Sequence, residues 1–211
     1  MPTPRETPIP GSTEQLPLME DFYTLQGEGT YQGRAAYFIR LAGCDVGCVW
    51  CDVKESWAMD AHPMVGLPVI VQRARESGAP IAVITGGEPA MHNLEALTRN
   101  LRATGMRTHI ETSGAHPLTG EWDWICLSPK KFKAPRPDIY ELAHELKIVV
   151  YHKSDLDWAE QEAARTSANC RLYLQPEWSR EKEMLPVIIA YVKKNPRWTV
   201  SLQVHKYMNI P

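Results

Sequence analysis

Short runs rich in β-branched and aromatic residues alternate along the chain with longer segments whose apolar residues recur every three or four positions. The short runs predict strands, and the longer segments predict amphipathic helices. Predicted strands cover residues 35–41, 81–85, 107–111, 123–127, 146–150, 171–175 and 198–204. Predicted helices cover residues 65–76, 93–104, 155–166 and 181–194, and a glycine follows each of the first two.

Strands that alternate with helices favour an α/β fold built on a parallel sheet. We expect a partial (β/α) barrel of about six parallel strands, because a complete eight-stranded barrel usually needs about 250 residues. In such folds the chemistry gathers at the carboxyl ends of the strands. Residues 1–17 are proline-rich and lack apolar periodicity, so we expect a flexible leader there and a single domain over residues 18–211.

The charges nearly cancel, with 23 Lys and Arg against 25 Asp and Glu, which argues against nucleic-acid binding through bulk electrostatics. No apolar run is long enough to span a membrane, and the N-terminus lacks the apolar core of a signal peptide. We therefore expect a cytoplasmic protein, in a compartment where thiols stay reduced. Five cysteines, an odd number, further disfavour a disulfide framework.

Three of the cysteines are close together, in the run Cys44-Asp-Val-Gly-Cys48-Val-Trp-Cys51. The run follows the predicted strand 35–41, so its three thiolates can converge on one metal centre. Iron–sulfur clusters normally take four cysteines, so three would leave one iron open to another ligand. A structural zinc site would need a fourth ligand, for which His62 is a candidate, and three buried free cysteines are the remaining alternative.

A second motif, Thr85-Gly-Gly-Glu-Pro89, comes at the end of the predicted strand 81–85. Adjacent glycines at the end of a strand let the backbone approach a ligand closely, and Glu88 could accept a hydrogen bond from a cationic amine. A tight turn without a ligand would use the same residues. Both motifs follow predicted strands, where a parallel α/β fold collects its functional groups.

Together these two motifs resemble those of the radical S-adenosylmethionine superfamily, whose three cysteines hold a 4Fe–4S cluster. Further motifs narrow the resemblance to the 7-carboxy-7-deazaguanine synthase family, over nearly all of residues 18–211. They are, in order, Leu25-Gln-Gly-Glu28, Glu111-Thr-Ser-Gly114, Leu127-Ser-Pro-Lys130, Glu145-Leu-Lys147, Leu174-Gln-Pro176 and the ending His205-Lys-Tyr-Met-Asn-Ile-Pro211.

The resemblance implies a lyase that converts 6-carboxy-5,6,7,8-tetrahydropterin to 7-carboxy-7-deazaguanine, with ring contraction and loss of ammonia, in deazapurine (queuosine-type) biosynthesis. It implies a 4Fe–4S cluster on Cys44, Cys48 and Cys51, and S-adenosylmethionine as a reused cofactor. These cofactors would carry the chemistry, so no catalytic side chain is assigned. A reductant such as flavodoxin or ferredoxin and a homodimer are also implied.

The resemblance implies a role for individual residues at the matching motif positions. The cofactor side would include Trp50, Gly86, Gly87, Glu88, Glu111, Ser128, Pro129 and Lys130. The substrate side would include Leu25, Gln26, Gly27, Glu28, Arg40, Thr85, His205 and Pro211. Arg40 would hold the substrate carboxylate through its planar fork, with a salt bridge at the barrel mouth as the structural alternative.

One position departs from the family. Members usually have Thr two residues after the last cysteine, where its hydroxyl binds Mg²⁺, and this chain has Val53. Valine offers no oxygen to a cation that takes about six ligands, so the magnesium requirement is in doubt. Asp52, a backbone carbonyl or a water could replace the missing ligand.

Two other functions remain open from the sequence. A radical activase that generates a glycyl radical on a partner protein would share the cysteine spacing, but it would lack the motif at 25–28 and the ending at 205–211. A small ferredoxin-like or zinc-binding module would share the cysteines and perform no catalysis.

Overall fold

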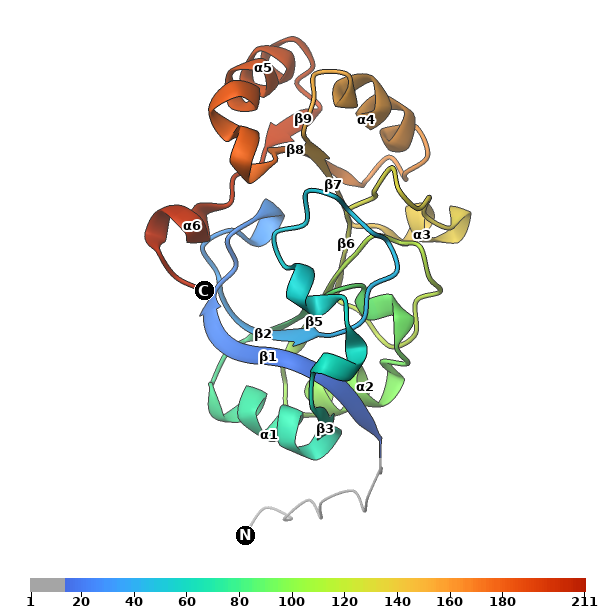
Figure 1. Cartoon of the computed structure of the whole chain (residues 1–211), viewed down its shortest axis with the longest axis vertical. Helices are drawn as coiled ribbons and strands as arrows, with labels where there is room; N and C mark the ends of the chain where they lie inside the picture. Colours follow the sequence, from blue (N-terminus) through green and yellow to red (C-terminus); the bar gives the residue numbers. More distant parts are fainter. Residues whose placement is uncertain (1–13) are drawn as a thin grey trace, which may run out of the picture.

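The computed structural model describes residues 14–211, which form nine strands and six α-helices (Figure 1). The strands are β1 Gln15–Leu25, β2 Ala35–Leu41, β3 Met64–Gly66, β4 Ile81–Gly86, β5 Arg107–Thr112, β6 Trp124–Leu127, β7 Glu145–Val150, β8 Arg171–Pro176 and β9 Trp198–Val200. The helices are α1 Leu67–Glu76, α2 Glu95–Ala103, α3 Pro137–Leu142, α4 Asp155–Ala163, α5 Glu181–Lys194 and α6 Val204–Met208.

All these strands belong to one sheet, in the order β3-β1-β2-β4-β5-β6-β7-β8-β9. Strand β2 and strands β4 to β9 run parallel to one another. At one edge of the sheet, β1 pairs antiparallel with β2 on one side and with β3 on the other. The sheet runs from β1 and β2 round to β8 and β9, and α6 lies at its open side beside the C-terminus (Figure 1). The predicted partial (β/α) barrel is confirmed.

Two hydrophobic clusters hold the helices against the sheet. The first includes Leu97 and Leu101 of α2, which are fully buried against β1, β2, β4 and β5. The second joins α3, α4 and α5 to β6–β9 and includes Ile188 and Trp198, at most 1% exposed. None of the helices in residues 14–211 combines the length and apolar character needed to cross a membrane. A third, smaller cluster of Ala36, Ile81 and Val83 lies on the opposite face of β2 and β4, where Tyr31 and Phe38 pack against it, so the concave side carries both apolar and polar groups.

All predicted strands and helices are present, and α5 has the predicted bounds. The largest shift concerns the predicted strand 198–204, which ends at Val200 because α6 begins at Val204. The predicted helix 65–76 begins at Leu67, since residues 64–66 form β3. The short helices α3 and α6 were not predicted, because six and five residues show too little of a helical period.

Strand β1 was not predicted either, and its first three residues fall in the expected leader 1–17. Those residues pair with β3, while residues 1–13 lie outside the described part of the chain. The pairing of β1 with β2 shifts register between Leu18 and Glu20. Such a bulge breaks the alternation of buried and exposed positions, which is the signal that identifies a strand in a sequence.

The loop between β1 and β2 crosses the concave side of the sheet. Thr30 N donates to Glu145 Oε2 at the start of β7 (2.9 Å). Gly29 N donates to Ser201 Oγ, just after β9 (3.0 Å). Ser201 Oγ in turn donates to Gln175 Oε1 of β8 (2.7 Å). The loop therefore spans the opening of the barrel and carries its residues into the interior.

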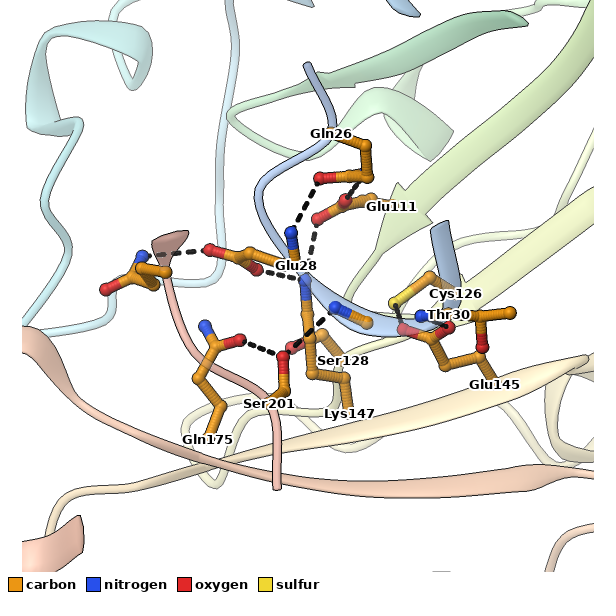
Figure 2. Close-up of polar contacts among 12 residues, drawn as sticks. Gln26, Glu28, Thr30, Glu111, Cys126, Ser128, Glu145, Lys147, Gln175 and Ser201 are labelled. Carbon is orange, nitrogen blue, oxygen red and sulfur yellow. Dashed lines mark hydrogen bonds and ion pairs between the residues drawn. The ribbon is translucent and has the colours of Figure 1, made fainter. Parts of the chain in front are cut away.

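A buried lysine holds this loop from the sheet side (Figure 2). Lys147 of β7 has a side chain only 4% exposed, and its Nζ contacts Glu28 of the loop and Glu111 of β5, the latter at 2.9 Å. Gln26 Nε2 donates to Glu111 (2.8 Å), and Gln203 Nε2 donates to Glu28 (2.9 Å). One ammonium thus joins the loop to the centre of the sheet.

The opposite charges in this network keep one another ionised. Burial alone would raise the pKa of Glu28, but the charge and hydrogen bond of Lys147 outweigh burial and lower that pKa to about 2. Burial would lower the pKa of Lys147, but the carboxylates of Glu111 and Glu28 outweigh it and raise that pKa well above its usual value. Both partners of the Glu28–Lys147 pair are therefore charged at neutral pH.

Lys147→Met should lower the free energy of unfolding by about 3–5 kcal/mol at pH 7, because it leaves buried carboxylates uncompensated. It should also reverse the pH dependence. In the unmodified protein the stabilisation from Glu28 is present above about pH 4.5 and is lost as the pH falls toward 2. In the variant, burial raises the Glu28 pKa, so stability should increase as the pH falls from 7 to 5. Urea unfolding at both pH values measures this.

The double variant Lys147→Met/Glu28→Gln is the control for this experiment. Removing one carboxylate should recover part of the stability at pH 7 and weaken the pH dependence. An equal loss at pH 5 and pH 7 in Lys147→Met would contradict the electrostatic role, because simple loss of packing does not titrate.

Candidate active site

The concave side of the sheet opens into a cleft of about 260 Å³. Its walls bring together the β1–β2 loop, the cysteine run, the glycine turn, the ends of several parallel strands and the C-terminal segment, residues 201–211. Of the residues predicted for the site, all except Pro129 line this cleft: Leu25, Gln26, Gly27, Glu28, Arg40, Cys44, Cys48, Trp50, Cys51, Thr85, Gly86, Gly87, Glu88, Glu111, Ser128, Lys130, His205 and Pro211.

The cysteine run forms a loop directly after β2. Gly43 starts the loop with a φ of 102°, a conformation that favours glycine, and its carbonyl accepts from Glu88 N (2.8 Å). Cys48 is 7% exposed, and Cys44 and Cys51 are half-buried. Burial raises the pKa of the Cys48 thiol to about 11. The loop thus presents three thiols from a fixed base.

The arrangement of the thiols bears on the two kinds of metal centre that the sequence left open, a cluster and a single zinc ion. Within residues 14–211, no three Cys, His, Asp or Glu side chains are grouped to bind one metal ion, which is the arrangement that zinc would need. A 4Fe–4S cluster instead takes its cysteines on different irons. His62, the candidate fourth zinc ligand, lies near Glu55 O (2.7 Å) and does not line the cleft.

The Gly86-Gly87 turn packs against the base of the cysteine loop. A Cβ on Gly86 would lie 2.0 Å from Leu41 O, and a Cβ on Gly87 would lie 2.3 Å from Gly43 O. Gly87 N donates to Leu41 O (2.9 Å). Any side chain here would push β4 away from β2, so the glycine pair brings the backbone of the turn to the cleft beside the cysteines.

The carboxylate of Glu88 fixes this turn. It belongs to a residue only 2% exposed and accepts from Ala90 N (3.0 Å), Thr112 Oγ1 (2.5 Å) and Ser113 N (2.7 Å), and also from the Ser113 hydroxyl. Four donors within the protein therefore surround it. This geometry gives the carboxylate a structural role; Glu88 also lines the cleft, and its hydrogen bond to a ligand amine stays a prediction.

Arg40 lies on β2 between Glu20 of β1 and Thr85 of β4. Its Nε donates to Glu20 Oε1 (2.7 Å), so the salt bridge considered as an alternative is present. The guanidinium also lines the cleft, and among the described residues no partner binds its two Nη groups. The salt bridge orients the fork and leaves it donors for a ligand carboxylate.

Trp50 and Lys130 form another part of the wall. Lys130 Nζ lies 5.9 Å from the centroid of the Trp50 ring and donates to Ser128 O (2.5 Å) and Ser128 Oγ (2.7 Å). Burial lowers the pKa of Lys130. Pro129 lies between Ser128 and Lys130 and does not line the cleft, so it contributes to the shape of the turn.

The C-terminal segment closes the open side of the cleft. The His205 ring packs on Gly27, where a Cβ would lie 2.1 Å from its Nδ1, and Val204 N donates to Gly27 O (3.0 Å). Burial lowers the pKa of His205, which keeps the ring neutral at neutral pH. Thr24 Oγ1 donates to Pro211 O (3.2 Å), and Pro211 lines the cleft.

Sequence reasoning assigned no role to six polar residues of the wall: Thr112, Ser113, Lys147, Gln175, Glu177 and Gln203. The first four lie in motifs that supported the resemblance. The available signal was a polar residue inside an otherwise apolar strand. A buried parallel strand tolerates such a residue only when it has partners.

Val53 also lines the cleft, at the position where the family usually has Thr. The neighbouring Asp52 was a candidate replacement ligand for magnesium. Its carboxylate is paired with Lys206 Nζ of α6 at 2.9 Å. Asp52 is therefore already neutralised by a cation from the protein.

No family model matches the chain. It is 57% identical over 198 residues to the 7-carboxy-7-deazaguanine synthase of Flavobacterium psychrophilum, with 94% of each chain covered. It is 49% identical to the synthase of Synechocystis (94% and 95% covered) and 34% identical to that of Escherichia coli (93% and 99% covered).

The fold agrees with these matches. The crystal structure of QueE from Escherichia coli superposes with a TM-score of 0.80 at 31% sequence identity, covering 89% of this chain and 93% of that one. The similarity extends over nearly the full length in sequence and in structure. This chain belongs to the 7-carboxy-7-deazaguanine synthase family.

Proposed function

We propose that this protein is a lyase that converts 6-carboxy-5,6,7,8-tetrahydropterin to 7-carboxy-7-deazaguanine, with ring contraction and loss of ammonia, in queuosine-type deazapurine biosynthesis. One observation carries the proposal: the cysteine loop, the glycine turn and the Glu28–Lys147–Glu111 network all face a single cleft. The cleft thus combines a place for a cluster with a set of polar groups for a small ring. The activase alternative has no support among the relatives.

The cofactor would occupy the part of the cleft near the cysteines. Cys44, Cys48 and Cys51 would hold a 4Fe–4S cluster, and S-adenosylmethionine would lie along the Gly86-Gly87 backbone toward Trp50 and the 128–130 turn. Cluster and S-adenosylmethionine together supply the radical chemistry that removes a hydrogen atom from the substrate. The protein itself orients the reactants and excludes water.

The pterin would bind across the Lys147 network. A pterin edge is a row of donors and acceptors, which Gln26 and Glu28 can match with amide and carboxylate groups, while Glu111 would face the cofactor side. Glu28 enters this role fully charged because Lys147 lowers its pKa. The Nη groups of Arg40 would bind the substrate carboxylate.

The remaining substrate contacts would come from the rim of the cleft. Thr85 and Leu25 would contact the ring, with Gly27 leaving room for His205. A neutral His205 can accept a hydrogen bond, and Pro211 would complete the cover. The C-terminal segment would thereby exclude water from the reacting atoms.

The partners of this protein are inferred from the reaction and from the family. A low-potential carrier such as flavodoxin or ferredoxin would supply the electron, and the family resemblance implies a homodimer as the functional unit. The chain's five cysteines, all within residues 14–211, are free thiols, which supports a reducing cytoplasm as the location.

Anaerobic turnover tests the proposed function. The reconstituted protein, S-adenosylmethionine, a reductant and the carboxytetrahydropterin should yield a product with the mass of 7-carboxy-7-deazaguanine. A brown, iron-loaded protein that cleaves S-adenosylmethionine but leaves the pterin unchanged would refute the assigned substrate. A colourless protein with bound zinc would refute the enzyme class.

Cys48→Ala should abolish the visible absorption of the cluster while the protein stays soluble. A site that already lacks one cysteine cannot lose another and still hold four irons. Iron content and the anaerobic spectrum are the measurements. Cys170→Ala, in the core outside the cleft, is the matched control and should keep its iron. Full iron content in Cys48→Ala would exclude this cysteine as a ligand.

Arg40→Lys should reduce turnover of the pterin by about tenfold or more, because lysine replaces a bidentate fork with a point charge. Cleavage of S-adenosylmethionine without substrate should change little. Steady-state kinetics of both reactions separate the two effects. If both fell together, Arg40 would serve only its salt bridge with Glu20.

Turnover should depend only slightly on added Mg²⁺, and Val53→Thr should increase that dependence. Valine and threonine have nearly the same shape, and the change replaces a methyl group with a hydroxyl that can act as a ligand oxygen. The assay is turnover after chelation, with the metal then titrated back into both proteins. A strong requirement in the unmodified protein, unchanged in Val53→Thr, would show that another group holds the metal.

A further inference from the structure

Lys206 forms the ion pair that joins the C-terminal segment to the cysteine loop. Its Nζ lies 2.9 Å from Asp52 Oδ2. Asp52 directly follows Cys51, and Lys206 directly follows His205. One contact therefore connects the part of the cleft proposed for the cofactor with the part proposed to cover the substrate.

Lys206 also contacts an aromatic pair, Trp178 and Tyr207. Its Nζ lies 5.0 Å from the centroid of the Trp178 ring, within reach of a cation–π interaction. Trp178 packs edge-on against Tyr207 with centroids 5.5 Å apart, and the Tyr207 hydroxyl bonds to Glu181 at the start of α5. These contacts fix the direction of the lysine side chain, which is only 20% exposed.

The C-terminal segment needs such a fixed point because it lies outside the sheet. It follows the last strand, and α6 has only five residues and ends at Asn209 in a left-handed conformation. A helix of this length is not stable by itself and depends on tertiary contacts. Its hydrogen bonds to the β1–β2 loop hold one side, and Lys206 holds the side that faces the cysteine loop.

We propose that Lys206 is a positioning residue. Its ion pair with Asp52 holds the C-terminal segment over the substrate and at a fixed position relative to the cysteine loop. The proposal rests on the function proposed above. Loss of the pair should leave the cluster in place and let the segment open more often. His205 and Pro211 would then cover the substrate for a smaller fraction of the time, which weakens substrate binding.

The cysteine loop offers a matched control. Asp45 follows Cys44 as Asp52 follows Cys51, and it is bound by Lys133 Nζ (2.6 Å) and faces His116 Nε2 (3.0 Å). Neither partner belongs to the C-terminal segment. Asp45→Asn and Asp52→Asn are therefore the same chemical change at the two ends of one loop, and only Asp52→Asn disturbs the proposed link.

The experiment compares the reconstituted unmodified protein with Lys206→Met, Asp52→Asn, Lys206→Arg and Asp45→Asn. Lys206→Met and Asp52→Asn should raise the KM for the carboxytetrahydropterin by about three- to tenfold, the range of an exposed ion pair reinforced by an aromatic contact. The double variant should be no worse than either single one. Lys206→Arg should largely recover the KM, because arginine also binds carboxylates and stacks on aromatic rings.

Iron content and substrate-free cleavage of S-adenosylmethionine should stay unchanged in all variants. Hydrogen exchange of the backbone amides of residues 203–210 supplies a readout independent of turnover. It should speed up in Lys206→Met and Asp52→Asn and stay unchanged in Asp45→Asn. This readout also works if the pterin proves not to be the substrate, so failure of the proposed function is distinguishable from failure of the link.

Two results would overturn the proposal. Unchanged amide exchange of residues 203–210 in Lys206→Met would show that the ion pair does not hold the segment. A loss of iron in Asp52→Asn equal to its loss of activity would show that the pair merely stabilises the cysteine loop.

Discussion

The ammonium of Lys147 between the carboxylates of Glu28 and Glu111 is the contact on which the arrangement of this site depends. It joins strand β7, strand β5 and the loop after β1, and it adds charge to the neutral-donor contacts of Thr30 with β7 and of Gln26 with β5. Buried charges of this kind gain little net stability over a well-packed apolar core, but they tolerate very few alternative geometries. The lysine therefore specifies where the loop lies.

This constraint extends outward through the loop to the C-terminal segment. Once Glu28 is fixed, Gly27 lies against the His205 ring, and Gln203 reaches Glu28. The two halves of the cleft thus have different origins. Close backbone packing between the neighbouring strands β2 and β4 shapes the half around the cysteines. Ion pairs between side chains of β5, β7 and the β1–β2 loop shape the opposite half.

The sequence allowed prediction of the parallel strands, the major helices and a large part of the cleft wall, since every predicted site residue except Pro129 lines the cleft. Strands such as β2 and β4 have continuous apolar runs bounded by glycines, and the two main motifs directly follow them. The antiparallel strand β1 was not predicted, because its bulge near Leu18 disrupts the alternation of buried and exposed positions. The partners of Glu88 and Lys147 could not be predicted, since pairing across a sheet depends on three-dimensional register, which single-residue patterns do not encode.

The bulge in β1 also bears on the behaviour of the protein in concentrated solution. Strand β3 covers β1 only at residues 15–17, so much of the outer edge of β1 has no partner among the described strands. An exposed edge invites pairing with the edge of another molecule. The irregularity between Leu18 and Glu20 interrupts the regular hydrogen-bonding pattern of β1 and increases the local twist of the strand. Such an edge is a poor template for aggregation, so the feature that hides the strand from sequence analysis also protects it.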